Sequence, residues 1–557
     1  MDVWSWARGS RFVMGIVAVG LVGSGLAVGA TTAAAEPVAP RPPVVVFAEN
    51  FENGQGSAIT WVNRYVGAAP LGQTYTADPV WLASCNGIIA SELNQATDPP
   101  GAGCGGWWPR VKDLAGVLGD WADGSGATNH AVTAYTHTDP GAGRTQLQST
   151  APIPISAPNR FIAFSVDVAE QNCYGQHTKY AFYLLDGATA IPASTRPIAP
   201  CEDATTVING TAVGTFHSDA PVLFAGTSLG LRLVNQQPSG NGNDSAFDNV
   251  RVLDVTPQVG IAFDPNPVEV GKTSNLTLTV TNTTELSAKA GWSFTLALPP
   301  GLTQAPTVAT TCAGTTFTPV AGAFSATGTL PAGAESCTIT LPVRAARTGT
   351  YTSCGGDFAP LVGLNPPGCA TLKVVGPTLA YAAHAHGVRV STLLGPLPPL
   401  APADLTCTTT PTTDSATLAT ASVLGSTSAL VDTATGTTDP DGLRTAHATS
   451  HTAVVNLLAG LITADELHSE AIAATTPTGA ITVSGSSGLT NLRVAGVPVI
   501  PKVNLNLTIP LVGSITTDEQ IPGPNGITVN ALHVRLLAGT DLVVGQTTAS
   551  LGTPCLG

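Results

Sequence analysis

The residues of this chain that could carry out chemistry include four carboxylates in its first half: Glu49, Glu52, Asp167 and Glu170. A polysaccharide hydrolase needs two carboxyl groups at a fixed separation across a cleft. The sequence does not establish such a separation, and carboxylates are common at strand edges. Secreted hydrolase therefore stays as an alternative, and no catalytic residue is predicted.

A second pattern, Gly226-Thr-Ser228-Leu-Gly230, matches the nucleophile elbow of hydrolases. That chemistry needs a strand before the serine and a helix after it, so that the hydroxyl is exposed beside an oxyanion hole. Residues 229–234 instead have the pattern of a strand. We therefore expect a turn at Ser228 and not a nucleophile.

Two histidines, His384 and His386, alternate along a predicted strand and so lie on one side of it. Two imidazoles so placed could bind a metal ion. No third ligand stands out nearby, and the pattern favours an exposed polar face.

Aromatic residues are concentrated in the first domain. Of the six tryptophans that follow the leader, five lie there: Trp61, Trp81, Trp107, Trp108 and Trp121. Exposed aromatic rings can stack on sugars, whereas buried ones only pack the core. Because Trp107 and Trp108 follow Cys104 in a Gly-rich stretch, we predict a ligand-binding role for this pair.

Ten cysteines fall into even clusters, which in an exported chain indicates disulfides. We expect sequential pairing within each cluster, although four cysteines allow three connectivities. The sequence contains no C-x-x-C pair, which argues against a zinc site. The cysteines are Cys85, Cys104, Cys173 and Cys201, then Cys312, Cys337, Cys354 and Cys369, and last Cys407 and Cys555.

The first 35 residues have the features of a secretory signal peptide. Arg8 and Arg11 precede an uncharged run over 12–30, and Ala33-Ala34-Ala35 offers a cleavage site before Glu36. A membrane anchor is the alternative. No later apolar run reaches spanning length, so we expect a secreted, extracellular or envelope-associated protein without an integral membrane segment.

The composition of the chain limits the classes of partner that it could bind. The net charge is −14 at pH 7, which disfavours nucleic acid and anionic membrane surfaces. Charged residues make up only 10% of the chain, and long amphipathic helices are nearly absent. The chain of 557 residues is too long for one core.

We predict an all-β protein of three domains after a leader at 1–35. Domain one (36–255) has short β-type runs typical of a jelly-roll or lectin-like sandwich. In domain two (256–376), residues 275–282 alternate strictly, which predicts a half-buried strand of an immunoglobulin-like sandwich. Domain three (377–557) is β-rich, and Val454–Leu467 could form a helix or strands.

Residues 264–302 of domain two resemble the immunoglobulin-like conserved repeat of bacterial surface proteins. Residues 380–407, 460–471, 488–499 and 526–536 of domain three resemble the secreted actinobacterial family called choice-of-anchor P. Domain one, with its pieces at 48–54 and 246–255, looks like a carbohydrate-binding jelly roll. These resemblances imply an extracellular or envelope protein and no catalytic residue.

In jelly-roll modules that resemble domain one, a carboxylate near the first strand often meets an aspartate in the last strand. The resemblance implies a structural calcium site at Glu49, Asn50, Glu52 and Asp248, with oxygen ligands that suit a hard cation. Ordinary turn chemistry is the alternative.

Together these features predict a non-enzymatic surface protein that serves in adhesion or binds envelope components or glycans. Domain one would be the binding head, domain two a spacer and domain three an envelope-associating module. The alternatives are the polysaccharide hydrolase and a purely structural envelope protein.

Overall fold

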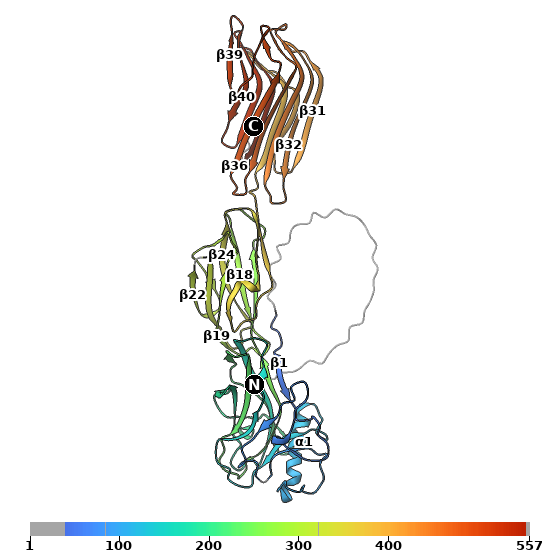
Figure 1. Cartoon of the computed structure of the whole chain (residues 1–557), viewed down its shortest axis with the longest axis vertical. Coiled ribbons are helices and arrows are strands. Elements are labelled where there is room, and N and C mark those ends of the chain that lie inside the picture. The colour runs from blue at the N-terminus through green and yellow to red at the C-terminus, as the bar shows by residue number, and fades with distance from the viewer. Residues whose placement is uncertain (1–38, 84, 321, 553–557) are drawn as a thin grey trace, which may run out of the picture.

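The computed structural model describes residues 39–83, 85–320 and 322–552; the predicted leader and Cys555 lie outside them. Three bodies follow one another along a rod, with domain one at one end and domain three at the other (Figure 1). Antiparallel strands dominate all three, which confirms the all-β prediction.

Domain one is a sandwich of two sheets whose facing sides enclose an aromatic-rich core. One sheet runs β11 (Thr206–Ile208), β12 (Thr211–His217), β8 (Arg160–Gln171), β15 (Asp244–Asp254), β5 (Ala131–Tyr135), β4 (Asn86–Ala90), β2 (Thr60–Trp61), with β1 (Val44–Glu49) beside β15 and β13 (Val222–Phe224) beside β8. The other runs β10 (Thr189–Pro192), β9 (Tyr180–Asp186), β14 (Ser228–Asn235), β6 (Arg144–Ser149), β3 (Tyr75–Thr76), with β7 (Ile153–Pro154) beside β14.

A helix, α1 (Trp108–Ala122), covers the outer face of the larger sheet of domain one. The 3-10 turn η2 (Gly105–Trp107) leads into it, so the expected Gly-rich loop around Trp107 and Trp108 is a helix start instead. Pro109 at the first turn suits that start. The buried face repeats at helical spacing through Val111, Leu114 and Leu118. The other helical turns of domain one are η1 (Val62–Arg64) and α2 (Pro200–Asp203).

Domain two packs three small sheets around Trp292 and its neighbours. The predicted strand is confirmed for residues 275–281, which are part of β18, where Leu276, Leu278 and Val280 are buried. The first sheet runs β16 (Gln258–Asp264), β18 (Thr273–Thr281), β24 (Ser336–Ala345), β20 (Leu302–Gln304), with β21 (Ala309–Thr310) beside β24. The second runs β17 (Val268–Glu269), β27 (Ala370–Val375), β25 (Gly349–Ser353). The third runs β22 (Ala313–Val320), β23 (Ala323–Leu330), β19 (Lys289–Ala297), β26 (Phe358–Val362), and the turn η3 (Gly355–Asp357) lies between β25 and β26 in the chain.

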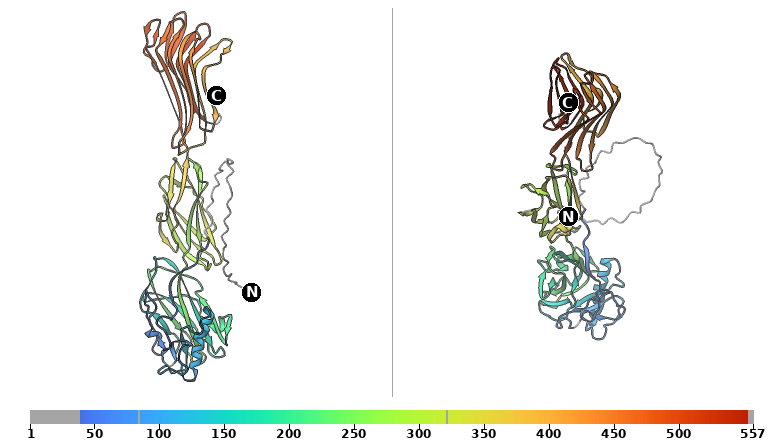
Figure 2. Two further views of the ribbon diagram at one scale, coloured as in Figure 1. Left: turned by 90° about the vertical axis from the view of Figure 1, so that its right-hand side faces the viewer. Right: turned by 45° about the horizontal axis from the view of Figure 1, so that its top comes forward.

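Domain three is a sandwich of long strands, as the turned views show (Figure 2). One sheet runs β29 (Gly395–Pro396), β28 (Ala380–Thr392), β42 (Asp541–Gly552), β41 (Gly526–Leu536), β40 (Gly513–Pro522), β39 (Leu505–Ile509), with β30 (Leu400–Thr408) beside β28. The other runs β31 (Thr412–Ala421), β32 (Gly425–Thr438), β33 (Arg444–Leu457), β34 (Ile462–Ala464), β37 (Arg493–Val494), β38 (Val497–Pro498), with β35 (Glu466–Thr475) beside β33 and β36 (Ile481–Thr490) beside β35.

The helix considered for Val454–Leu467 is wrong. β33 and β34 occupy this segment and pair with each other across a tight turn. Gly460 lies in that turn with φ +88°, a conformation that a helix excludes and glycine tolerates. The β-branched side chains of Val454 and Val455 favour the strand.

Direct contacts join the three bodies. The Arg160 guanidinium donates to the Asn365 amide oxygen at 2.6 Å, and Phe161 of domain one belongs to the core cluster of domain two. At the second junction, the Gly376 amide donates to the Asp441 carbonyl at 2.9 Å. No helix within the described ranges is long and apolar enough to cross a membrane.

The described part of the chain contains four disulfides, and they pair in sequence order as predicted: Cys85–Cys104, Cys173–Cys201, Cys312–Cys337 and Cys354–Cys369. Cys407 is also disulfide-bonded, while Cys555, its predicted partner, lies outside the described residues. Two of these four disulfides lie in domain one, and the other two lie in domain two.

Candidate functional site

Strand register places one end of domain one farthest from the rest of the rod. β8 begins at Arg160, which contacts domain two, and ends eleven residues later at Gln171. Gln171 pairs with Asp244 on β15, and Asp244 pairs in turn with Tyr135 on β5. We call this end, with Trp107, Tyr135, Asn172 and Tyr174, the free end of domain one.

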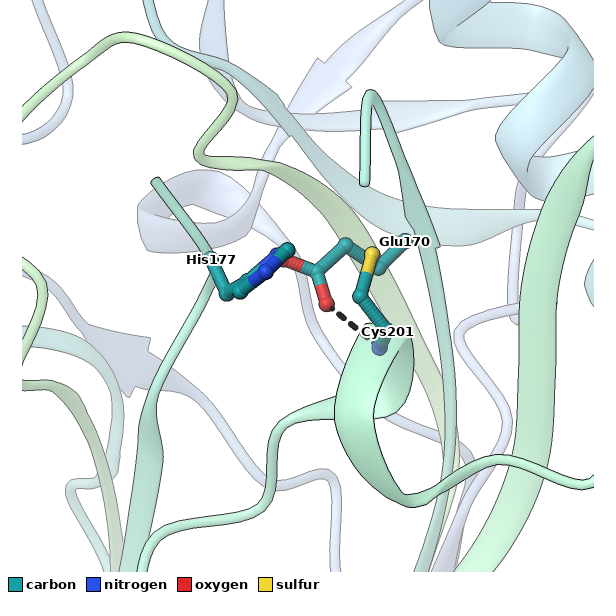
Figure 3. Close-up of side chains that lie close together, drawn as sticks. All are labelled: Glu170, His177 and Cys201. Carbon is teal, nitrogen blue, oxygen red and sulfur yellow. Dashed lines mark hydrogen bonds between the residues drawn. The ribbon is translucent and has the colours of Figure 1, made fainter. Parts of the chain in front are cut away.

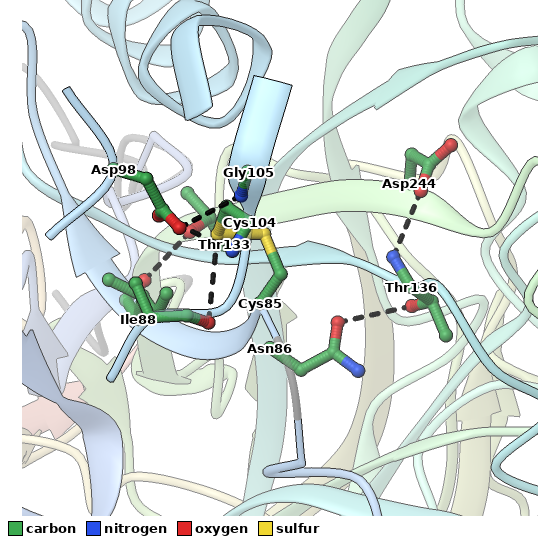
Figure 4. Close-up of a disulfide and its surroundings, with 10 residues drawn as sticks. Cys85, Asn86, Ile88, Asp98, Cys104, Gly105, Thr133, Thr136 and Asp244 are labelled. Carbon is green, nitrogen blue, oxygen red and sulfur yellow. Dashed lines mark hydrogen bonds between the residues drawn. A yellow bond between two sulfur atoms is a disulfide. The ribbon is translucent and has the colours of Figure 1, made fainter. Parts of the chain in front are cut away.

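A disulfide and a carboxylate hold Trp107 at the free end. Cys85–Cys104 ties η2 to the start of β4, and both oxygens of Asp98 accept backbone amides, from Cys104 at 3.3 Å and from Gly105 at 2.8 Å (Figure 4). The Trp107 amide then donates to the Cys104 carbonyl at 3.1 Å. The indole is thus presented from a fixed backbone.

Trp107 and Trp108 have opposite surroundings. The Trp107 ring is 52% exposed and stacks on Tyr135, with 5.5 Å between ring centroids and 18° between planes. Trp108 is fully buried, and its indole N–H donates to the Gln95 carbonyl at 2.8 Å. The ligand-binding prediction for Trp108 is therefore wrong, because a buried, hydrogen-bonded ring cannot meet a ligand.

Asn172 connects the stacked pair to a second exposed aromatic ring. Its amide nitrogen donates to the Tyr135 hydroxyl at 3.1 Å and to the Asp244 carboxylate at 2.6 Å. Its amide oxygen accepts the Tyr174 hydroxyl at 3.2 Å. Tyr174 is 87% exposed, beside the Cys173–Cys201 disulfide that anchors its loop.

Two hollows lie at this end and share Arg110 and Asn209. One has a volume of about 330 Å³ and is lined by Asn172, Tyr174 and Gly210 as well as the shared pair. The other, of about 480 Å³, follows the α1 helix past Asp113 and Asp120. The two linings together offer a guanidinium, amides, carboxylates and the Tyr174 ring.

Burial perturbs the acids behind the hollow. Burial raises the pKa of Asp244 to about 6, against the opposing effect of hydrogen bonds from Asn172 and the Thr136 amide. Burial also raises the pKa of the Tyr135 hydroxyl. Asp244 therefore binds a proton at a higher pH than a free aspartate does, and the Tyr135 hydroxyl stays protonated near neutral pH.

Glu170, one residue before the end of β8, is fully buried. Its two oxygens accept the backbone amides of Thr178 at 2.5 Å and Cys201 at 2.9 Å, which ties the Tyr174 loop to α2. Burial raises its pKa to about 7, with the two amides opposing. Both oxygens of this candidate for the hydrolase alternative are thus bonded to backbone amides.

His177 lies beside this carboxylate, and its buried Nδ1 has no hydrogen-bond partner. Ligand atoms of Glu170, His177 and Cys201 lie within 4.8 Å of one another, the one such metal-type group in the described ranges (Figure 3). The Cys201 sulfur is already bonded to Cys173, so it is not a thiolate. The group lacks the third ligand that a metal centre needs.

The structure does not bring the predicted calcium ligands together. The carboxylate of Glu49 accepts the Tyr65 and Tyr75 hydroxyls at 2.9 and 2.8 Å, and that of Glu52 meets the His130 ring at 2.7 Å. No metal-type group in the described ranges includes Glu49, Glu52 or Asp248. The calcium prediction is wrong for this set.

The other two proposed ligands have local roles. Burial raises the pKa of Asp248 well above its usual range, which disfavours the anion that a cation requires. Its oxygens accept the Asn129 side-chain amide at 3.0 Å and the Asn249 backbone amide at 2.6 Å. The Asn50 side chain faces its own turn, with its oxygen 3.4 Å from the Glu52 amide.

Two remaining motifs resolve into local structure. Ser228 is the first residue of β14, so a strand and not a helix follows it, as expected, although the serine lies in that strand and the bend is at residues 226–227. His384 Nδ1 and His386 Nε2 lie 2.8 and 3.2 Å from one oxygen of Asp404, on the neighbouring strand β30. This carboxylate, 18 residues or more away in sequence, was not foreseen.

Comparisons with known proteins add little. A family described as a domain of unknown function, DUF7933, matches residues 257–374, within domain two. No curated protein matches the chain. The cryo-EM structure of the arabinofuranosyltransferase AftD from Mycobacteria aligns at 10% identity and a TM-score of 0.16, over 88% of this chain and 43% of that one. This chain spans less than half of that protein, and so low a score carries no argument.

Proposed function

We propose that this chain is an exported, non-enzymatic surface protein that binds glycans at the free end of domain one. The observation that carries the proposal is the half-exposed Trp107 ring, stacked on Tyr135, whose hydroxyl accepts a hydrogen bond from Asn172 in the lining of a polar hollow. Sugars present apolar faces that stack on aromatic rings and hydroxyls that need hydrogen-bond partners.

The polar residues of this hollow suit such a ligand. Arg110, Asn172 and Asn209 line the hollow, and side-chain amides and guanidinium groups donate to sugar hydroxyls. Tyr174 offers a second ring. Because the Cys85–Cys104 and Cys173–Cys201 disulfides fix both aromatic segments, little conformational entropy is lost on binding.

In the same proposal, domain two is a spacer of the immunoglobulin-like surface repeat, and domain three is an envelope-associating module of the choice-of-anchor P type. The end-to-end arrangement supports this division, because it sets the glycan-binding end away from the other two domains (Figure 1). Four disulfides among the described residues suit an oxidising exterior.

A non-enzymatic role is supported by the bonding of the candidate acids. Glu49 and Glu170 are buried and hold tyrosine hydroxyls or backbone amides. The Asp167 oxygens accept Thr215 at 2.5 Å and Asn249 at 2.9 Å. Reducing-sugar release from polysaccharides by the purified protein would contradict the proposal in favour of the hydrolase.

The test is a glycan array probed with the purified protein and three variants. We expect wild type to bind a subset of glycans, and Trp107→Ala and Tyr174→Ala each to weaken binding at least tenfold, about 1.4 kcal/mol, as for aromatic hot spots. Val45→Ala, an exposed apolar residue on β1 near domain two, is the matched control and should bind as wild type does.

A further inference from the structure

The end of domain three that lies farthest from domain two consists of hairpin turns. β28 starts at Ala380, near the junction, and ends at Thr392, where Ser391 pairs with Asp541 of β42. β32 begins and β33 ends at the same far side, because Thr438 bonds Tyr381 near the junction. We call this end the apolar tip; its turns are residues 393–394, 422–424, 458–461, 495–496, 510–512 and 537–540.

The turns of the apolar tip contact one another. The Leu537 amide donates to the Val512 carbonyl at 2.9 Å, and the Leu458 amide donates to the Leu424 carbonyl at 2.8 Å. The Ala495 amide donates to the Leu461 carbonyl at 2.7 Å. Turns far apart in sequence thus form the closed end of each sheet of the sandwich.

The side chains at the tip are apolar and protrude. Leu394 and Leu511 are 101% and 96% exposed, and Leu393 and Leu537 are more than two-thirds exposed. None of the turns contains a charged residue, although the whole chain carries a net charge of −14. Single exposed leucines are ordinary on protein surfaces, but several on adjoining turns of one end need an explanation.

The backbone of the tip is suited to an apolar medium. Besides the bonds between turns, the Val512 amide donates to the Ile509 carbonyl at 3.1 Å, and the Gly539 amide donates to the Leu536 carbonyl at 3.0 Å. In hydrocarbon each unpaired peptide group costs several kcal/mol, so an inserting loop must bond its own amides. The amides of Val512, Leu537 and Gly539 in these turns are bonded in this way.

Arginines follow directly behind two of the turns. Arg493 begins the short strand before the 495–496 turn. Arg535 comes just before the 537–540 turn and pairs with Glu519 at 2.7 Å, while Asp541 follows the same turn directly. Long cationic side chains just behind an apolar surface are typical of residues that lie at lipid headgroups.

We propose that the apolar tip inserts into the acyl region of a lipid bilayer and so attaches domain three to the cell envelope. A protein partner is usually bound through a surface with a polar rim that forms hydrogen bonds, whereas these turns present nearly fully exposed leucines and no charged residue. Insertion of this kind depends on apolar contact and not on the net charge. The inference deepens the envelope association proposed above and rests on it.

The test is flotation of the purified full-length protein with phosphatidylcholine vesicles. We expect wild type to float with the vesicles, and Leu394→Asp/Leu511→Asp to lose at least tenfold in the bound fraction. Both leucines are almost completely exposed, so the variant should fold. The matched control, Val45→Asp/Val207→Asp, changes two exposed apolar residues of domain one and should float like wild type.

Three outcomes would overturn the inference: wild type that stays with the soluble fraction, a tip variant that floats as well as wild type, or a control that loses binding equally. A wild-type dimer that the tip variant converts to monomer, without flotation, would assign the tip to a protein interface instead. Glycan binding by the tip variant is measured in parallel, so that failure of lipid binding and failure of the glycan proposal are distinguished.

Discussion

At Glu170, burial and hydrogen bonding act in opposite directions on one carboxyl group. Burial raises its pKa from 4.5 to about 7, although two backbone amides favour the anion. Since the same carboxyl group ties the Tyr174 loop to α2, its protonation state bears on the loop that carries an exposed ring. The neighbouring Asp244, with a pKa of about 6, acts in the same sense.

These shifts predict a pH dependence for domain one. A carboxyl group whose folded pKa is raised binds more protons in the folded state, so its contribution to stability is present below about pH 4.5 and lost as the pH rises through about 7. We expect the unfolding temperature of domain one to fall between these values, and Glu170→Gln to flatten that fall. A variant profile as steep as that of wild type would contradict this explanation.

The residues of the candidate site were predictable only in part. The exposed Trp107 could be selected from its residue type and its place after Cys104, but its neighbour Trp108 could not be told apart from it. Which ring is buried depends on the helix that begins between them. The sequence does not single out Tyr174 as a site residue. Its exposure depends on the hydrogen bond to Asn172 and on the Cys173–Cys201 disulfide, which are seen only in the folded structure.

The element that joins β18 to β19 in domain two encloses a lysine. Lys289 is fully buried, and its ammonium group bonds Glu285, the Asn282 amide oxygen at 3.1 Å and the Ser287 hydroxyl at 2.8 Å. Burial lowers the lysine pKa, and Glu285 opposes that effect. Because the Lys289 ammonium group bonds acceptors on Asn282, Glu285 and Ser287, it holds the segment between β18 and β19 in one conformation.

We expect Lys289→Met to destabilise domain two by about 2 kcal/mol, because the buried Asn282 would lose a hydrogen-bond partner and the partly exposed Glu285 would lose its ion pair. Denaturant unfolding followed by Trp292, the one tryptophan after residue 255, measures the change. Lys272→Met, at an exposed turn position, is the control and should shift stability by less than about 0.5 kcal/mol. A loss no larger than that of the control would mean that the buried ion contributes nothing.

Elements with a strong alternating pattern were predictable, and the ambiguous ones were not. The strict alternation at Leu276, Leu278 and Val280 identified β18. Helix α1 escaped notice because its glycines, Gly116 and Gly119, are poor helix formers. They are needed where the helix approaches residues 126–129, since a Cβ at Gly119 would lie 2.5 Å from Asn129. Tertiary packing outweighed local propensity there.

At the scale of the whole molecule, the rod separates two unlike ends (Figure 1). The free end of domain one combines aromatic rings with hydrogen-bonding groups, whereas the apolar tip of domain three has leucines and no charge in its turns. The three-domain division is a prediction from composition and cysteine clusters. The placement of the two ends could not be predicted from the sequence, because it depends on which turns gather at the far side of each sandwich.

Calorimetric titration of the purified protein with the oligosaccharide that binds best on the array tests the glycan proposal most sharply. We expect saturable binding heat for wild type and Val45→Ala, and at least tenfold weaker binding in a Trp107→Ala/Tyr174→Ala variant that keeps the wild-type unfolding temperature. Binding of equal affinity in the double variant, or no oligosaccharide bound by wild type, would contradict it.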